Sequence, residues 1–151
     1  MSFKKVVCII AACITVGLLR GHSTHTPPYR GVFFRKHHLD VETIKKGIDH
    51  VVEKTDGSVN LHDRSGATLL VCAVETGEPE LVHYLVRTLH ADVSVPGVPQ
   101  KNTAEQNAST ILPIDLARER LELSETLEEQ EKWQKIIHIL RVAERNNDPL
   151  M

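Results

Sequence analysis

The stretch DRSGATLLVCAVETGEPELVHYLVRTLHADVSV, residues 63–95, contains two short apolar segments separated by a glycine. Thr68 is a good N-cap for the first segment, which ends before Gly77. Pro79 suits the first turn of a second helix, and the apolar residues after it recur at helical spacing. The stretch therefore predicts two short antiparallel helices. Their apolar faces need neighbours on both sides, which favours a chain built from repeats.

Similar segments do occur on both sides of this stretch. Their period is about 33 residues and is stretched in the last copy, and the matching pairs are 56–63 with 90–97, 67–73 with 111–117, and 80–86 with 135–141. His83 and His138 take equivalent positions in the last pair. Upstream, residues 40–54 carry one apolar helical stripe, and Gly47 leaves open whether that helix is continuous.

Residues 63–93 resemble the ankyrin repeat. Twelve positions follow the pattern of that repeat in order, namely Asp63, Gly66, Thr68, Leu70, Ala73, Gly77, Glu80, Val82, Leu85, Ala91, Asp92 and Val93. The resemblance implies an all-α fold, a short solenoid of paired antiparallel helices joined by hairpin-like loops. About 2.5–3 repeats would fill a domain of residues 39–146, followed by a C-terminal tail at 147–151.

The chain departs from the ankyrin pattern at several points. The pair Leu89-His90, which includes one inserted residue, replaces the glycine that ends the second helix. His90 must therefore take an unusual backbone conformation, or the turn must differ. One longer insertion, roughly 94–110, lengthens a loop. Another adds about 11 residues between Ala117 and Ile136. Those residues favour helix, so we expect long final helices.

The amino terminus, residues 1–23, contains two lysines and then fourteen uncharged residues, 6–19. A helix of fourteen residues spans about 21 Å, less than the roughly 30 Å hydrocarbon core of a bilayer. This pattern is typical of a secretory signal peptide, here with cleavage before Thr24. An uncleaved amino-terminal anchor and a buried helix of the domain are the alternatives. We expect an exported protein, secreted or periplasmic, or else one anchored to a membrane through this segment.

A linker is expected at residues 24–38, because Pro27 and Pro28 exclude regular helix there. The basic residues and two phenylalanines that follow either contact a membrane surface or lead into the first helix.

Composition and motifs exclude several functional classes. Apolar residues make up 41% and charged residues 25% of the chain, as in soluble globular proteins, and aromatic residues only 4%, so the core must be aliphatic. Beyond residue 23 the net charge is −5, which gives no support for nucleic-acid binding. Neither a nucleophile motif nor a phosphate loop occurs, and no cluster of cysteine or carboxylate residues has zinc-ligand spacing. We therefore expect no enzyme activity, no cofactor and no metal. Cys72 is interpreted as a small buried apolar residue.

The ankyrin resemblance implies a protein–protein interaction module that binds through its hairpin loops and the concave face formed by the first helix of each pair. We expect this module to be a monomer. The matching positions are His62, Arg64, Ser65 and Ala67 on the hairpin, Glu75 and Thr76 on the helix, and Ala108, Ser109, Ile111, Glu119 and Arg120 in the last copy. The alternative is a membrane-anchored structural or chaperone-like accessory protein of the cell envelope, which touches the membrane only through residues 1–23.

Overall fold

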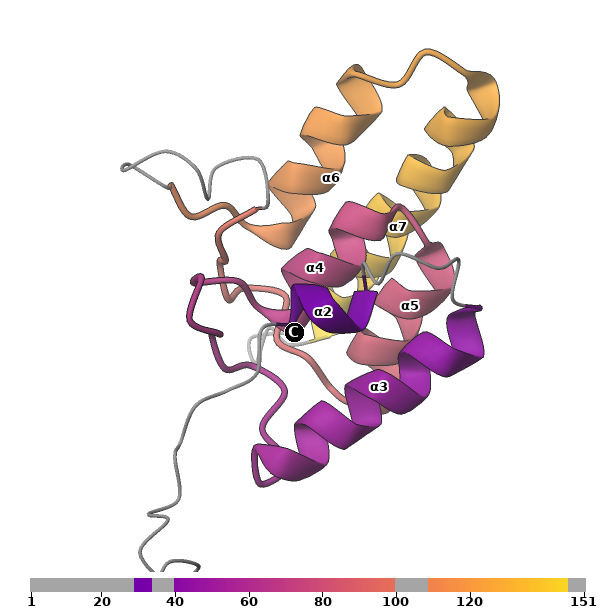
Figure 1. Ribbon diagram of the computed structural model, residues 1–151. Coiled ribbons are helices and arrows are strands. Elements are labelled where there is room, and N and C mark those ends of the chain that lie inside the picture. Colours follow the sequence, from indigo (N-terminus) through magenta and orange to yellow (C-terminus); the bar gives the residue numbers. More distant parts are fainter. Residues whose placement is uncertain (1–28, 34–39, 100–108, 147–151) are drawn as a thin grey trace, which may run out of the picture.

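The computed structural model describes residues 29–33, 40–99 and 109–146, which form an all-α fold (Figure 1). Its helices are α2 (Arg30–Phe33), α3 (Val41–Lys54), α4 (Leu69–Thr76), α5 (Pro79–His83), the π-helical turn η1 (Tyr84–Thr88), α6 (Pro113–Glu122) and α7 (Leu127–Asn146). Within these residues the only β pairing is an isolated antiparallel bridge between Gly97 and Ile111. The expected all-α class is confirmed. The amino-terminal segment 1–23 and the tail 147–151 lie outside the described residues.

The pair α4–α5 forms where the sequence predicts it. The Thr68 hydroxyl oxygen accepts a hydrogen bond from the Val71 amide at 3.2 Å and so caps α4. Gly77 ends the helix in the left-handed conformation, with φ at 70°. Pro79 then starts α5. All six residues from Leu69 to Val74 are buried, because α4 is covered on every side.

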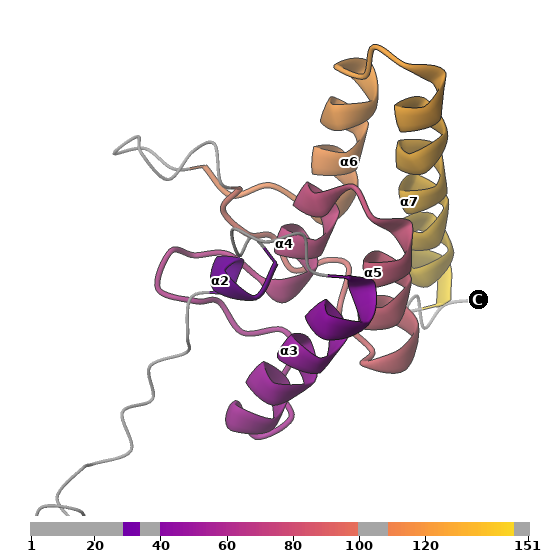
Figure 2. The same ribbon diagram turned by 45° about the vertical axis from the view of Figure 1, so that its right-hand side comes forward.

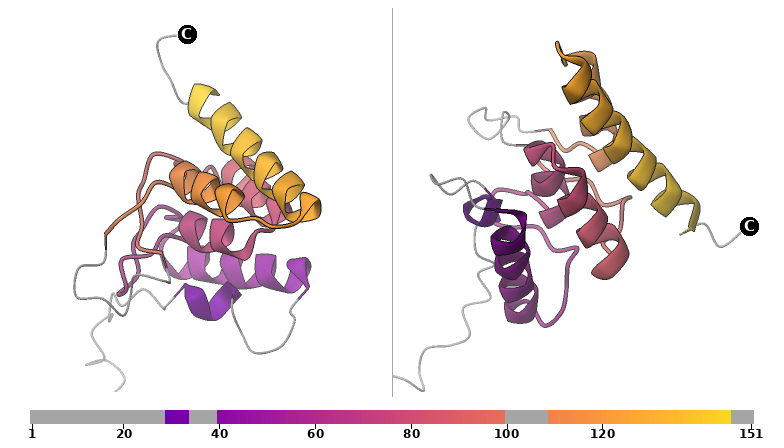
Figure 3. Two further views of the ribbon diagram at one scale, coloured as in Figure 1. Left: turned by 90° about the horizontal axis from the view of Figure 1, so that it is seen from above. Right: turned by 90° about the vertical axis from the view of Figure 1, so that its right-hand side faces the viewer.

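The helices stack in three layers, α2 with α3, α4 with α5, and α6 with α7 (Figures 2 and 3). The first helices of the layers contact one another in the order α2, α4, α6, and the second helices in the order α3, α5, α7. Leu85 in the middle layer is fully buried. The core is therefore continuous through the stack and consists mainly of aliphatic side chains.

Helix α3 is a single helix that does not break at Gly47. Asp40 caps it, because its Oδ1 accepts a hydrogen bond from the Thr43 amide at 2.8 Å. A Cβ atom at Gly47 would lie 2.8 Å from Cγ1 of Val32 in α2. Glycine in the middle of α3 thus allows α2 to pack closely against it.

Residues 29–33 correct the boundary expected for the linker. Tyr29 is fully buried and Phe33 nearly so, although both lie within the expected linker 24–38. The Tyr29 amide donates a hydrogen bond to Asp63 Oδ2 at 2.9 Å. This short segment therefore belongs to the packed domain and supplies the first helix of its first layer. The remainder of the expected linker, 24–28 and 34–38, lies outside the described residues.

The inserted residue near position 89 is accommodated by η1. The Leu89 amide donates to the Tyr84 carbonyl at 3.2 Å, a pairing five residues apart that defines a π-helical turn. Single-residue insertions into an α-helix are commonly absorbed in this way. His90 follows with φ at 55°, so the unusual backbone conformation expected for it is present.

The last layer is longer than the others, as the sequence predicts. Helices α6 and α7 extend beyond the α4–α5 turn and end in a protruding tip (Figures 1 and 2). Pro113 occupies the first turn of α6. The bridge between Gly97 and Ile111 joins the two ends of the loop expected at 94–110, of which residues 100–108 are not described.

Candidate partner-binding surface

The turn between α3 and α4 is built around the carboxylate of Asp63, which is 6% exposed. Its Oδ1 accepts hydrogen bonds from the Ser65 amide at 2.8 Å, the Ser65 hydroxyl at 2.6 Å and the Ala67 amide at 3.0 Å. Together with the bond from Tyr29 to Oδ2, these contacts fix the backbone. Arg64, in the middle of the turn, is exposed to solvent. The turn is thus a rigid support for an outward-facing cation.

A second turn, at residues 92–96, repeats this construction. Asp92 Oδ1 accepts from the Ser94 amide at 2.9 Å and from its hydroxyl at 2.6 Å. These two hydrogen bonds stabilise the carboxylate and lower the pKa of Asp92 below its usual value.

Two hydrogen bonds join the adjacent turns. The Asp92 amide donates to Asn60 Oδ1 at 2.9 Å, and His62 Nε2 lies 2.7 Å from the Pro96 carbonyl oxygen. We call the exposed edge formed by residues 60–65, 92–96 and 109–111 the turn surface. It is one continuous surface because these bonds join the first two segments and the bridge between Gly97 and Ile111 joins the third.

Most of the residues expected to bind a partner are accessible. His62, Arg64, Ser109 and Glu119 are exposed, and Ser65, Glu75, Thr76, Ile111 and Arg120 are half-buried. The prediction that Ala67 binds a partner was wrong. Its side chain is fully buried, because the turn folds back on Asp63, and so it cannot contact a partner. Ala108 lies outside the described residues.

Of the half-buried residues, Thr76 has structural contacts, whereas Arg120 has a buried group without one. The Thr76 hydroxyl donates to the Ala73 carbonyl at 2.6 Å and accepts from the Glu78 amide at 3.2 Å, which shapes the end of α4. Nε of Arg120 is buried and has no hydrogen-bond partner within the described residues. We therefore place the candidate surface on the turns, where His62, Arg64 and Ser65 lie together, rather than on the helix ends.

Sequence reasoning missed Asn60, Leu61 and Ser94 on this surface. Leu61 is 40% exposed and lies beside His62, and Ser94 is exposed on the next turn. The match between segments 56–63 and 90–97 could have indicated these residues, because equivalent positions in adjacent turns must face the same side.

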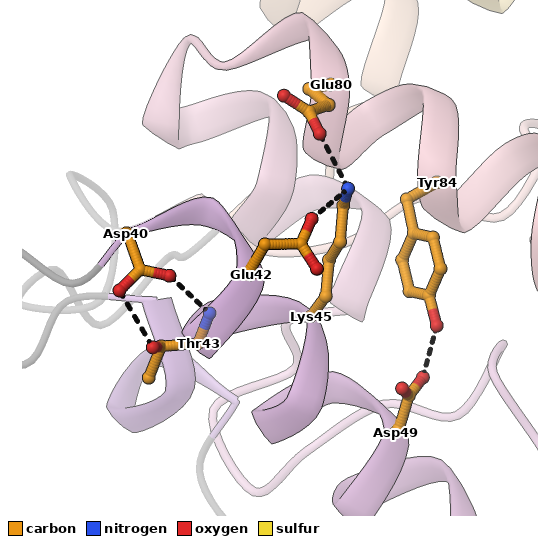
Figure 4. Close-up of polar contacts among 7 residues, drawn as sticks. All are labelled: Asp40, Glu42, Thr43, Lys45, Asp49, Glu80 and Tyr84. Atoms are coloured by element: carbon orange, nitrogen blue, oxygen red, sulfur yellow. Dashed lines mark hydrogen bonds and ion pairs between the residues drawn. The ribbon is translucent and has the colours of Figure 1, made fainter.

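The opposite side of the stack carries a polar cluster that ties α3 to α5 (Figure 4). Lys45 Nζ lies 2.9 Å from Glu42 Oε1 and 2.6 Å from Glu80 Oε1. Hydrogen bonds to Glu80 and then to Glu42 raise the pKa of Lys45. The ammonium group also lies 5.5 Å from the centre of the Tyr84 ring.

The same side carries a groove between α5 and α7 of about 560 Å³. His83 and His138, which take equivalent repeat positions, both line it and both are exposed. Within the described residues, no group of three or more histidine, cysteine or acidic side chains could hold a metal ion.

Comparisons of the chain with known protein families, with curated proteins and with solved structures found no match. None of the helices in the described part of the chain has the length and apolar character needed to cross a bilayer.

Proposed function

We propose that this chain is an ankyrin-like repeat domain that binds a protein partner through its turn surface. The observation that carries the proposal is a recurrent separation in sequence. Contacts between neighbouring layers join Tyr29 with Asp63 and His62 with Pro96, both 34 residues apart, and Asn60 with Asp92, 32 residues apart. Such regular spacing is expected when successive repeats of about 33 residues stack on one another.

The chemistry of the turn surface favours an acidic partner. Arg64 is exposed on a rigid turn, and its guanidinium group is suited to paired hydrogen bonds with a carboxylate. A rigid backbone reduces the entropy lost on binding. Leu61, beside it, offers apolar area for contact. We propose that the partner presents aspartate or glutamate side chains next to a small apolar patch.

The proposal places the protein outside the cytoplasm, because residues 1–23 have the pattern of a signal peptide. If that segment is retained, the same domain would serve as a membrane-anchored accessory protein of the envelope. Amino-terminal sequencing of the protein from its native compartment distinguishes the two, since a product that begins near Thr24 is exported and one that begins at Met1 is anchored.

A photo-crosslinking experiment tests the surface and identifies the partner. In one variant a photoreactive amino acid replaces Arg64 on the turn surface. In the control variant it replaces Arg87 in η1, on the outer side of the stack, which is the side opposite the turn surface; both positions are exposed. In the native compartment the Arg64 position should give a discrete adduct with one protein that the Arg87 position does not give. An equal adduct from both positions, or one from Arg87 alone, would refute binding at the turn surface.

A further inference from the structure

The tip between α6 and α7 exposes two leucines. Leu123 is 60% exposed and Leu127 is 79% exposed, more than the other large hydrophobic residues that the structure describes. A single exposed leucine is ordinary, but two leucines on a protruding turn form a local apolar patch. The turn surface proposed above does not include them.

Charges along the adjoining chain are sharply segregated. Residues 122–131 contain five glutamates and no lysine or arginine, whereas residues 132–141 contain three basic residues, one histidine and no acidic residue. On α7, Glu128, Glu131, Lys135 and His138 recur every three or four residues, and all four are exposed. They therefore lie along one face of the helix, acidic towards the tip and basic towards its C-terminal half.

The basic half of this face borders the groove between α5 and α7. The groove is lined from α7 by Glu131, Gln134, Lys135, His138 and Ile139, and from α5 by Pro79, Glu80 and His83. Helices α5 and α7 both face the viewer in the right-hand view of Figure 3. An apolar, acidic tip and a groove lined by apolar, basic and acidic side chains thus lie next to each other on one side of the same molecule.

We propose that two copies of this chain associate through antiparallel contact of their α7 helices, with each tip placed against the groove of the other copy. A twofold axis between residues 131 and 132 sets Glu128 of one copy opposite Lys135 of the second, and brings Leu127 to the groove. Such an interface is closed at two copies, because both contribute the same surface. This dimer replaces the monomer expected from the sequence.

Charge decides between the dimer and other arrangements. A parallel arrangement would place like charges together, and contact between two tips alone would oppose ten glutamates. An anionic lipid surface would repel the same tip. The antiparallel dimer is the arrangement that sets the acidic half of each α7 face against the basic half of the other copy while it covers the leucines.

Charge reversal tests the pairing. The full chain is studied in dilute non-ionic detergent, because residues 6–19 form an apolar run, and the dimer dissociation constant is measured by sedimentation equilibrium. Glu128→Lys and Lys135→Glu should each raise that constant at least tenfold, about 1.4 kcal/mol. The double variant should restore most of the wild-type value. Glu53→Lys, on an exposed position of α3, is the matched control and should change it little.

Cross-linking supplies an independent readout. Equal amounts of ¹⁴N- and ¹⁵N-labelled chain are mixed and treated with a carbodiimide, which joins adjacent carboxylates and amines. Mixed-isotope peptides linking Glu128 to Lys135 are expected. A monomer at all concentrations tested, a dimer unaffected by either single variant, or a monomeric tip that binds neutral vesicles through Leu127 would each overturn the proposal.

Discussion

The phenol of Tyr84 donates a hydrogen bond to Asp49 Oδ1 at 2.5 Å, and 35 residues separate the two. Lys45 and Glu80, whose charged groups lie 2.6 Å apart, have the same separation. One pair of adjacent layers is therefore joined at equivalent points by two polar contacts (Figure 4). Both contacts join α3 to the α5–η1 segment. Variants at these residues therefore test the stacking of the first two layers and leave the core side chains unchanged.

Alkaline pH should weaken the contact between Tyr84 and Asp49. The hydrogen bond to Asp49, followed by partial burial, raises the pKa of Tyr84 from 10.0 to about 12. The folded state thus favours the neutral phenol, so this contribution to stability is fully present below pH 10 and is lost as the pH rises through 12. Tyr84→Phe should lower the free energy of unfolding at pH 7 by about 0.5–1.5 kcal/mol.

Denaturant titrations of wild type and Tyr84→Phe across pH 8–12.5 measure this effect. The difference between them should shrink towards zero between pH 10 and 12. A difference that stays constant over that range would show that the phenol is not bonded to Asp49.

Removal of the Leu85 side chain should destabilise the whole stack. Leu85 is fully buried in the middle layer, so Leu85→Ala leaves a cavity and should cost roughly 2–5 kcal/mol of unfolding free energy. Leu61→Ala, at a side chain that is 40% exposed, is the control and should cost less than about 1 kcal/mol. Equal losses in urea titrations would mean that the layers do not share one core.

Asp63 should be the most important polar side chain of the turns. Asp63→Ala leaves the amides of Tyr29, Ser65 and Ala67 without their acceptor, and should cost roughly 2–4 kcal/mol. Asp92→Ala removes the two hydrogen bonds that Ser94 donates, which are more exposed to solvent than those of Asp63. It should lower the free energy of unfolding by about 1 kcal/mol or less. If thermal unfolding ranked the two variants in the reverse order, the turn at 92–96 would be the structural one.

Replacement of His90 by glycine should stabilise the folded protein. Its φ of 55° lies in the left-handed region, where a side chain costs roughly 1–2 kcal/mol relative to glycine. His90→Gly should therefore raise the midpoint of thermal unfolding. His83→Gly, at an exposed position within α5, should lower it, because glycine weakens a helix interior. A decrease in both variants would contradict the left-handed turn.

Local sequence signals predicted the central layer well. Thr68, Gly77 and Pro79 determine where a helix begins or ends through contacts within one or two helical turns. Their effects therefore do not depend on the rest of the chain. The unusual backbone of His90 could be anticipated from the missing glycine. The π-helical turn could not, because a one-residue insertion is compatible with several hydrogen-bond patterns and packing selects among them.

Tertiary contacts decided the features that were missed. Residues 29–33 follow two prolines and are too short to show helical periodicity, yet Tyr29 is held by a bond to Asp63, 34 residues away. Ala67 was assigned to the binding surface by its place in the repeat pattern, whereas the fold of the turn buries it. Long-range hydrogen bonds of this kind leave no local pattern in the sequence.

The central claim is that the turn surface binds the partner, and the affinity of charge-reversal variants tests it most directly. With the partner identified by cross-linking, isothermal titration calorimetry should show that Arg64→Glu weakens binding at least tenfold, about 1.4 kcal/mol, with unchanged thermal stability. Arg87→Glu, an equal change of charge on the outer side, should leave the dissociation constant within about twofold. If Arg87→Glu abolished binding while Arg64→Glu did not, the partner would lie on the outer helices and the account would be contradicted.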